Sequence, residues 1–288
     1  MAFGDITALT LGVMQGRLSV PLGSQLQSFP WDTWEREFDL AAQADLQLVE
    51  WIIEADRFHD NPLLTNVGRA RLRQLEAATG TMVRTACADC FMSWPLTTSD
   101  ADTARDRLKL LGQILEASAE LGIAIVTLPF VDASAIRNNA ERDAAVTILS
   151  EAAATADACN VNLACEMSLP PEGFASFLAE LDHPRIWVTY DSGNSASLGY
   201  DVGEEMSAYG SRVVSVHVKD RIRDGGTVPL GDGDADFGQL FESLNVSRYT
   251  GPLILQAARC GDEVSTIKGY VRFIRQHLAV ATRGLSSS

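Results

Sequence analysis

The chain has 288 residues, of which 46% are hydrophobic and 21% are charged, a composition typical of a globular protein. No apolar run reaches the roughly 18 residues of a membrane span, and residues 1–10, MAFGDITALT, lack the charged and apolar regions of a signal peptide. A net charge of −15 disfavours a nucleic-acid partner, and five cysteines in a chain of this length indicate reduced thiols in a cytoplasmic protein.

Short apolar runs alternate with longer amphipathic stretches along the chain. A short apolar run between turn signals is typical of a buried strand. The predicted strands cover residues 8–15, 46–53, 81–88, 123–130, 161–166, 186–191, 213–218 and 252–257.

The stretches between these runs have helical patterns. Apolar residues recur at helical spacing between residues 110 and 121 and again between residues 264 and 278, where Asp262 is placed to cap the helix. The alanine-rich segment 134–160 predicts one long helix. The pattern is weakest over residues 194–212, which three glycines interrupt.

Eight strand–helix pairs in a chain of this length predict an α/β fold, a (β/α)₈ TIM barrel. The barrel is expected to form one domain over residues 1–283, with a disordered tail at 284–288. A doubly wound sheet is the alternative, but such a sheet usually has fewer strands, and no GxGxxG follows the first strand.

Four consecutive predicted strands carry a potential metal ligand at or near their C-terminal ends: Glu166, Asp191, His217 and Gln256. The C-terminal strand ends form the active face of a barrel. A carboxylate such as Glu166 at the end of a buried strand is costly unless a cation or hydrogen-bond donors meet it. Two carboxylates, an imidazole and an amide oxygen suit Mn²⁺, Mg²⁺ or Co²⁺, with zinc as an alternative. The competing interpretation is four separate groups bonded to loop backbone.

Several motifs resemble one known superfamily. They are LGVMQGRLS at 11–19, CADCFM at 87–92, CEMS at 165–168, YDSGN at 190–194, HVKD at 217–220 and VPLGDGDADF at 228–237. In this order they resemble the xylose-isomerase-like barrel superfamily. The chain is most similar to its sugar phosphate isomerase/epimerase branch, which includes tagatose epimerase-like and hydroxypyruvate isomerase-like enzymes.

The resemblance implies one divalent metal held by Glu, Asp, His and Glu on strands five to eight, the first three being Glu166, Asp191 and His217 here. It also implies that the two glutamates move a proton next to a carbonyl, through a metal-bound cis-enediolate. The expected activity is therefore isomerisation or epimerisation of a small sugar, ketose or sugar phosphate. Whether the protein is a homo-oligomer is left open.

The fourth ligand departs from this pattern, because Gln256 stands where the family has its second glutamate. An amide oxygen can bind a metal, but an amide cannot shuttle protons at neutral pH. Glu166 would then be the main catalytic base, with water, Lys219 or another donor returning the proton. The alternatives are a lyase or dehydratase that needs one carboxylate, or a non-catalytic sugar-binding barrel. A nuclease of the endonuclease IV type is disfavoured by only four histidines and the net charge of −15.

Other polar residues near the predicted strand ends are candidates for binding substrate. They are Gln15, Arg17, Glu50, Asp89, Asn194 and Arg221. An arginine suits anion contacts, although Arg17 could instead hold its own loop, and Arg221 could belong to a solvated charge run. The CADC cysteines on either side of Asp89 are interpreted as packed thiols, because no second CxxC or nearby histidine completes a zinc set.

Overall fold

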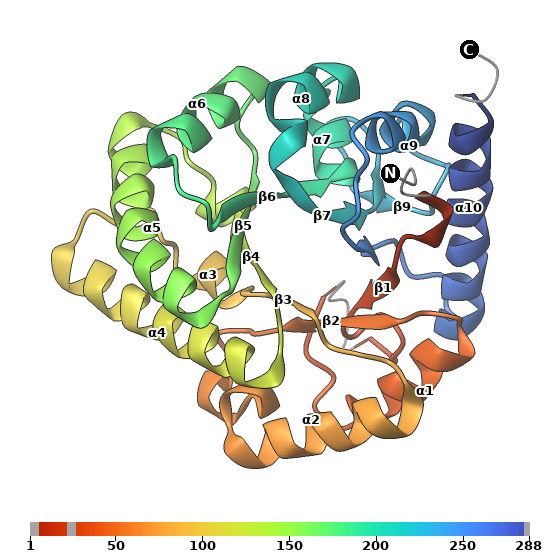
Figure 1. Cartoon of the computed structure of the whole chain (residues 1–288), viewed down its shortest axis with the longest axis horizontal. Helices are drawn as coiled ribbons and strands as arrows, with labels where there is room; N and C mark the ends of the chain where they lie inside the picture. Colours follow the sequence, from red (N-terminus) through yellow and green to blue (C-terminus); the bar gives the residue numbers. More distant parts are fainter. Residues whose placement is uncertain (1–5, 22–26, 285–288) are drawn as a thin grey trace. The chain divides into compact units, whose positions relative to one another are not determined.

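The computed structural model describes residues 6–21 and 27–284. Eight strands close into a barrel in the order β1-β10-β7-β6-β5-β4-β3-β2, and neighbouring strands pair in parallel (Figure 1). All eight predicted strands are therefore confirmed, as is the (β/α)₈ fold. Their bounds are β1 Leu11–Met14, β2 Leu48–Ile52, β3 Thr85–Cys87, β4 Ile125–Phe130, β5 Asn162–Met167, β6 Ile186–Asp191, β7 Val213–Val218 and β10 Leu253–Leu255.

Helices and a small hairpin connect the strands. The α-helices are α1 Arg36–Gln43, α2 Asn66–Thr79, α3 Cys90–Ser93, α4 Ala101–Leu121, α5 Asn139–Cys159, α6 Pro171–Leu181, α7 Ser192–Leu198, α8 Val202–Tyr209, α9 Phe237–Val246 and α10 Glu263–Gly284. The 3₁₀ helices are η1 Ile6–Ala8, η2 Phe58–Asp60, η3 Pro62–Leu64, η4 Asp132–Ser134 and η5 Gly210–Arg212. The hairpin pairs β8 Asp220–Arg221 with β9 Thr227–Val228.

Local sequence explains where the long helices begin and end. Asp100 and Asn138 cap α4 and α5 by accepting from the backbone N–H groups of Thr103 and Glu141. Gly122 follows α4 in the left-handed region that glycine adopts at little cost. The predicted cap of the last helix is also confirmed, because Asp262 accepts from Ser265 N at 3.1 Å.

The chain divides into two compact units. The terminal unit comprises Met1–Val49 and Thr189–Ser288, and the central unit comprises Glu50–Val188. Within the terminal unit, α9 packs on α10 through the aromatic rings of Phe237, Phe273 and His277. Within the central unit, β4 and β5 pair along their full length, and α4 packs on α5 (Figure 1).

The core is aliphatic and aromatic, as the apolar runs predict. Val126, Leu128, Leu163 and Cys165 on β4 and β5 are fully buried, and all five cysteines are free thiols. Within the described ranges, none of the helices combines the length and the hydropathy that a membrane span requires. One domain over residues 1–283 stays a prediction, and residues 285–288 of the predicted tail lie outside the described residues.

Candidate metal and sugar site

Lys219 is the centre of a polar network at the strand ends of the terminal unit. Its Nζ lies 3.3 Å from Asp191 Oδ2, 3.3 Å from Asn194 Oδ1 and 3.2 Å from Gln256 Oε1. These oxygens can accept all three ammonium protons. The Lys219 side chain is 13% exposed and that of Asp191 only 1%, so little water competes for the ion pair. Two of the predicted metal ligands thus share one lysine.

The YDSGN motif explains how Lys219 reaches this position. Ser192 Oγ accepts from Lys219 N at 3.0 Å and donates to Lys219 O at 2.6 Å, which fixes the lysine backbone. A Cβ at Gly193 would lie 2.6 Å from Lys219 Cγ, so only glycine leaves room for the lysine stem. Asp191 Oδ1 accepts from Asn194 N and caps α7, which holds the carboxylate still.

The segment after β7 carries two further charged groups with local partners. Arg221 donates to Gly225 O through Nε and Nη2, and to Asn194 Oδ1 through Nη1 at 2.9 Å. Asn194 Oδ1 therefore lies between the cations of Lys219 and Arg221, which joins both residues to the network. Asp220 is fully buried and accepts from the backbone N–H groups of Gly231, Gly233 and Ala235.

The β1 loop carries Gln15 and Arg17, and both side chains are buried. The loop is held by Glu37 of α1, which accepts from Gly16 N at 2.9 Å and from Leu18 N at 3.1 Å. Burial raises the pKa of Glu37 to about 7, although these N–H groups and the charge of Arg259 act in the opposite direction. Glu37 thus titrates near neutral pH while it anchors the loop.

Several acidic side chains lie at or near the strand ends of the central unit. Glu50 on β2 is fully buried, and Glu166 on β5 is 5% exposed. Asp89, which follows β3, accepts from the Cys87 thiol at 3.1 Å. Burial is the main cause that raises the pKa of Asp89 to about 6, and the carboxylates of Glu166, Glu54 and Glu50 raise it further. The same surroundings raise the pKa of Cys87, which agrees with a packed, inert thiol.

Three of the four predicted metal ligands come together. One oxygen each of Glu166 and Asp191 and one ring nitrogen of His217 lie within 4.8 Å of one another, and all three residues are buried. Atoms that share an ion at about 2.0–2.6 Å must lie within roughly twice that distance of one another. Two carboxylates and an imidazole therefore form a donor set that fits a divalent cation. Gln256 Oε1 reaches the same network through Lys219, and its coordination of an ion stays a prediction.

Two organising residues, Glu37 and Asp220, were missed by the sequence analysis. Each had a signal in the sequence. Glu37 shares the buried face of α1 with Phe38 and Ala41, and a charge on an apolar helix face needs a partner. Asp220 precedes the glycine-rich segment GDGDA at 231–235, whose backbone N–H groups need an acceptor. Neither signal names the partner, which only the folded loops supply.

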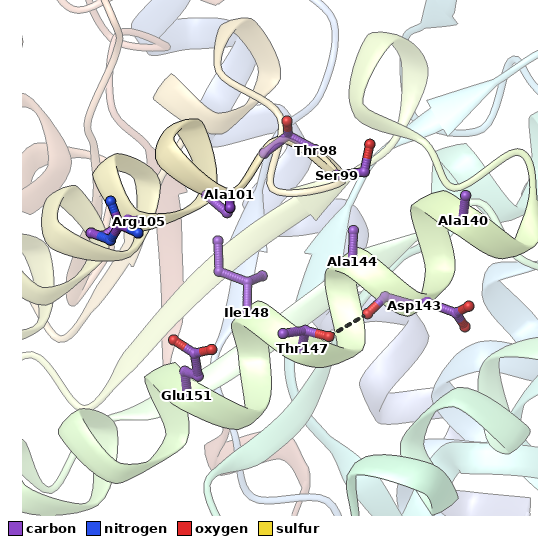
Figure 2. A pocket seen from close by; sticks show the side chains of 11 residues that line it. Thr98, Ser99, Ala101, Arg105, Ala140, Asp143, Ala144, Thr147, Ile148 and Glu151 are labelled. Atoms are coloured by element: carbon purple, nitrogen blue, oxygen red, sulfur yellow. Dashed lines mark hydrogen bonds between the residues drawn. The ribbon is translucent and has the colours of Figure 1, made fainter.

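The groove between α4 and α5 of the central unit has a volume of about 480 Å³ (Figure 2). Its walls are mainly small side chains such as Ala101, Ala140 and Ala144, with Arg105 and Glu151 on opposite helices. Arg105 forms an ion pair with Asp102. None of the predicted site residues lines this groove, so the candidate chemistry lies at the strand ends.

Comparison with known proteins agrees with the fold and narrows the chemistry. The sequence model of a family described as xylose isomerase-like TIM barrel matches residues 38–277. L-ribulose-5-phosphate 3-epimerase UlaE of Salmonella heidelberg (strain SL476) is 27% identical over 254 residues, which cover 82% of this chain and 87% of that protein. The structure of D-allulose 3-epimerase from Methylomonas sp. has a TM-score of 0.74 at 17% identity and covers 96% of this chain and 100% of that one. A xylose isomerase-like TIM barrel protein from Mycobacterium smegmatis in complex with magnesium has a TM-score of 0.70 at 17% identity and covers 95% of this chain and 98% of that one.

Proposed function

This chain belongs to the xylose isomerase-like TIM barrel family, and we propose that it is a divalent-metal-dependent epimerase or isomerase of a small sugar or sugar phosphate. The observation that carries the proposal is the meeting of Glu166, Asp191 and His217 within 4.8 Å. The printed names of similar proteins, L-ribulose-5-phosphate 3-epimerase and D-allulose 3-epimerase, support the reaction class.

Glu166 is the proposed base. A carboxylate can take a proton from the carbon next to a sugar carbonyl if that proton is made more acidic. A divalent cation held by Glu166, Asp191 and His217 would supply this effect as a Lewis acid on the sugar oxygens. The low exposure of Glu166, 5%, keeps bulk water from competing with the sugar for such a cation.

Lys219 is the proposed second acid/base group, because Gln256 cannot move a proton. The ammonium group is held by three oxygen acceptors at 3.2–3.3 Å. Hydrogen bonds of this length are compatible with a catalytic role, because such bonds often tighten only when the substrate binds. One of these acceptors is replaced when Lys219 turns to the substrate, while Asp191 keeps the charge of the ammonium balanced.

The remaining predicted contacts complete the sugar site. Asn194 and Arg221 are joined by a 2.9 Å hydrogen bond, so we assign them together to the sugar hydroxyl groups. Gln15 and Arg17 of the β1 loop, together with Glu50 and Asp89 of the central unit, are assigned to the same substrate as further contacts. Their burial or partial burial suits a small ligand that is enclosed by protein.

The test is exchange of substrate C–H protons with D₂O. Wild-type protein in excess Mn²⁺ should exchange the proton next to the carbonyl of at least one ketose or ketose phosphate, followed by NMR. Mn²⁺ should also raise the melting temperature relative to EDTA, because it binds the native state alone. Asp191→Ala should abolish this rise, whereas the control Asp143→Ala on α5 should keep it.

Absence of exchange with every ketose would contradict an epimerase or isomerase. A sugar-induced rise in melting temperature without exchange would then identify a sugar-binding barrel, and loss of water from the sugar would identify a dehydratase. Identical melting in EDTA and in Mn²⁺ would contradict the metal site itself.

A further inference from the structure

The short helix α7, which begins directly after the proposed metal ligand Asp191, has little apolar surface to hold it in place. Its sequence is SGNSASL, and its one large apolar side chain, Leu198, is 41% exposed. A helix of seven residues is unstable alone, because most helical stability in proteins comes from packing of an apolar face. The position of α7 therefore depends on the hydrogen bonds of its polar side chains.

Two groups of the proposed site are attached to α7. Asp191 Oδ1 accepts from Asn194 N at 2.8 Å, and Ser192 Oγ accepts from Lys219 N at 3.0 Å. A shift of α7 would move both the carboxylate that is proposed to bind the metal and the lysine that is proposed to return the proton. A misplacement of roughly 1 Å can lower a catalytic rate by about 10²-fold, so the anchoring of α7 matters for the reaction.

The anchor is the carboxylate of Glu205 on α8, which is only 3% exposed. Its Oε2 accepts from Ser195 Oγ on α7 and from the Tyr190 hydroxyl on β6 at 3.0 Å, while Oε1 accepts from Tyr209 on α8 at 2.7 Å. The Tyr190 hydroxyl also lies 3.2 Å from Ser195 Oγ. Tyr190 directly precedes Asp191, so Glu205 holds the chain on both sides of this ligand.

A carboxylate is a costly choice for this position. Burial raises the pKa of Glu205, and the hydrogen bonds from Ser195, Tyr209 and Tyr190 act in the opposite direction. An apolar side chain of similar size would fill the space without this cost. A fully hydrogen-bonded polar network, in contrast, specifies one arrangement of its members, which apolar packing does less strictly.

We propose that Glu205 is a positioning residue, which fixes α7 through Ser195 and Tyr190 and so holds Asp191 in the orientation that binds the divalent cation. This inference rests on the proposed function, because the orientation of Asp191 matters for a metal site. The anchoring of α7 itself can be measured without metal, so the two can fail separately.

The first test measures amide hydrogen exchange of Asn194 and Lys219 by NMR in the metal-free protein. Ser195→Ala removes the hydroxyl that joins Glu205 to α7, and it should raise both exchange rates about tenfold through local opening. Tyr209→Phe is the matched control, because it removes a hydroxyl from the same carboxylate, but that hydrogen bond stays within α8. Equal rates in the two variants would overturn the inference, since they would reflect general stability alone.

The second test measures the affinity for Mn²⁺ by titration calorimetry. Glu205→Gln removes the charge, and its amide nitrogen cannot accept from a hydroxyl, so the apparent Kd should rise about tenfold, as it does when partners of metal ligands are lost. Ser195→Ala should act in the same direction and serves alone if Glu205→Gln does not fold. Glu204→Gln on the exposed face of α8 and Tyr209→Phe should keep the wild-type Kd.

A wild-type Kd in Ser195→Ala and in folded Glu205→Gln would overturn the inference, as would an equal rise in Tyr209→Phe. If the wild type binds no Mn²⁺, the proposed function fails. The amide exchange rates then still decide whether Glu205 fixes α7.

Discussion

Lys219 in the terminal unit and Asp89 in the central unit are both half-buried charges near strand ends, but their surroundings differ in sign. Lys219 meets three oxygen acceptors, one of them the carboxylate of Asp191. Asp89 accepts one thiol hydrogen bond from Cys87 and is otherwise raised in pKa, to about 6, by burial and by neighbouring carboxylates. Lys219 is thus paired with a carboxylate of opposite charge, whereas Asp89 lies near further carboxylates that raise its pKa.

The difference separates two tasks. A balanced network fixes geometry, because each side chain has one arrangement in which all its hydrogen bonds are satisfied. Like charges that are held close together lower the stability of the fold. They are found mainly at functional sites, where a bound ligand offsets the charge. We therefore assign orientation of the substrate and return of the proton to the network around Lys219, and abstraction of the proton to Glu166.

The largest effect is expected from removing the carboxylate charge of Glu166 in the central unit. Glu166→Gln should lower the rate of C–H exchange with D₂O by about 10³-fold, since general base catalysis contributes roughly 10²–10⁴-fold. Glu172→Gln is the control, because Glu172 is exposed on α6 and makes the same charge change. Exchange within about tenfold of the wild-type rate would show that Glu166 is a ligand only.

The next prediction tests how far the hydrogen bonds to Glu37 in the terminal unit offset the free-energy cost of burying its carboxylate. Glu37 has its pKa raised from 4.5 to about 7, so between these values the native state binds more protons than the unfolded state. Its contribution to the free energy of unfolding is then full below pH 4.5 and is lost as the pH rises through about 7. The difference in pKa corresponds to about 3 kcal/mol.

Denaturant unfolding of wild type and Glu37→Gln between pH 4.5 and 8 measures the contribution of Glu37 to the free energy of unfolding. The wild type should lose up to about 3 kcal/mol across the window relative to the variant, and Asp39→Asn on the exposed face of α1 should follow the wild type. Parallel curves for wild type and Glu37→Gln would mean that the N–H groups of Gly16 and Leu18 offset the burial cost fully.

A smaller effect disturbs the balanced network at its centre. Lys219→Met removes the ammonium and keeps the length of the stem, and it should lower kcat by about 10²-fold through loss of the second acid/base group. Lys219→Arg keeps a cation beside Asp191 but cannot release a proton at neutral pH, so it should not restore activity. Full activity in Lys219→Arg would show that the residue only positions Asp191, and Lys109→Met on α4 is the control for charge loss.

The sequence predicts the barrel well because its signals are local and repeated. Each strand is a short apolar run whose burial does not depend on distant detail, and the caps Asp100, Asn138 and Asp262 lie directly beside their helices. The strand ends are also predictable, because parallel strands of a barrel share one direction. Glu166, Asp191 and His217 therefore come together, as their placement in three consecutive runs indicates.

The hydrogen-bond network is less predictable because its partners come from different loops. Only the folded chain shows that the three acceptors of Lys219 lie on β6, on α7 and directly after β10. Arg221 illustrates the same limit, because the sequence alone allowed two interpretations, a solvated charge or a substrate contact. Its hydrogen bond to Asn194 now places it in the network, and its contact with substrate stays a prediction.

The smallest effect is expected from adding one carboxylate to the terminal unit beside the proposed metal site. Gln256→Glu adds a carboxylate 3.2 Å from Lys219, at the position of the second glutamate that the family resemblance implies. Affinity for a hard cation rises with the number of charged ligands, but Lys219 competes for the new charge, so the apparent Kd for Mn²⁺ should fall by only about tenfold. Titration calorimetry measures this change, with Gln276→Glu on the exposed face of α10 as the control. An equal Kd in both variants would place Gln256 outside the shell of the ion. A fall much beyond tenfold would show that Lys219 gives way to the metal, and the network around it would then be a state of the protein before the metal binds.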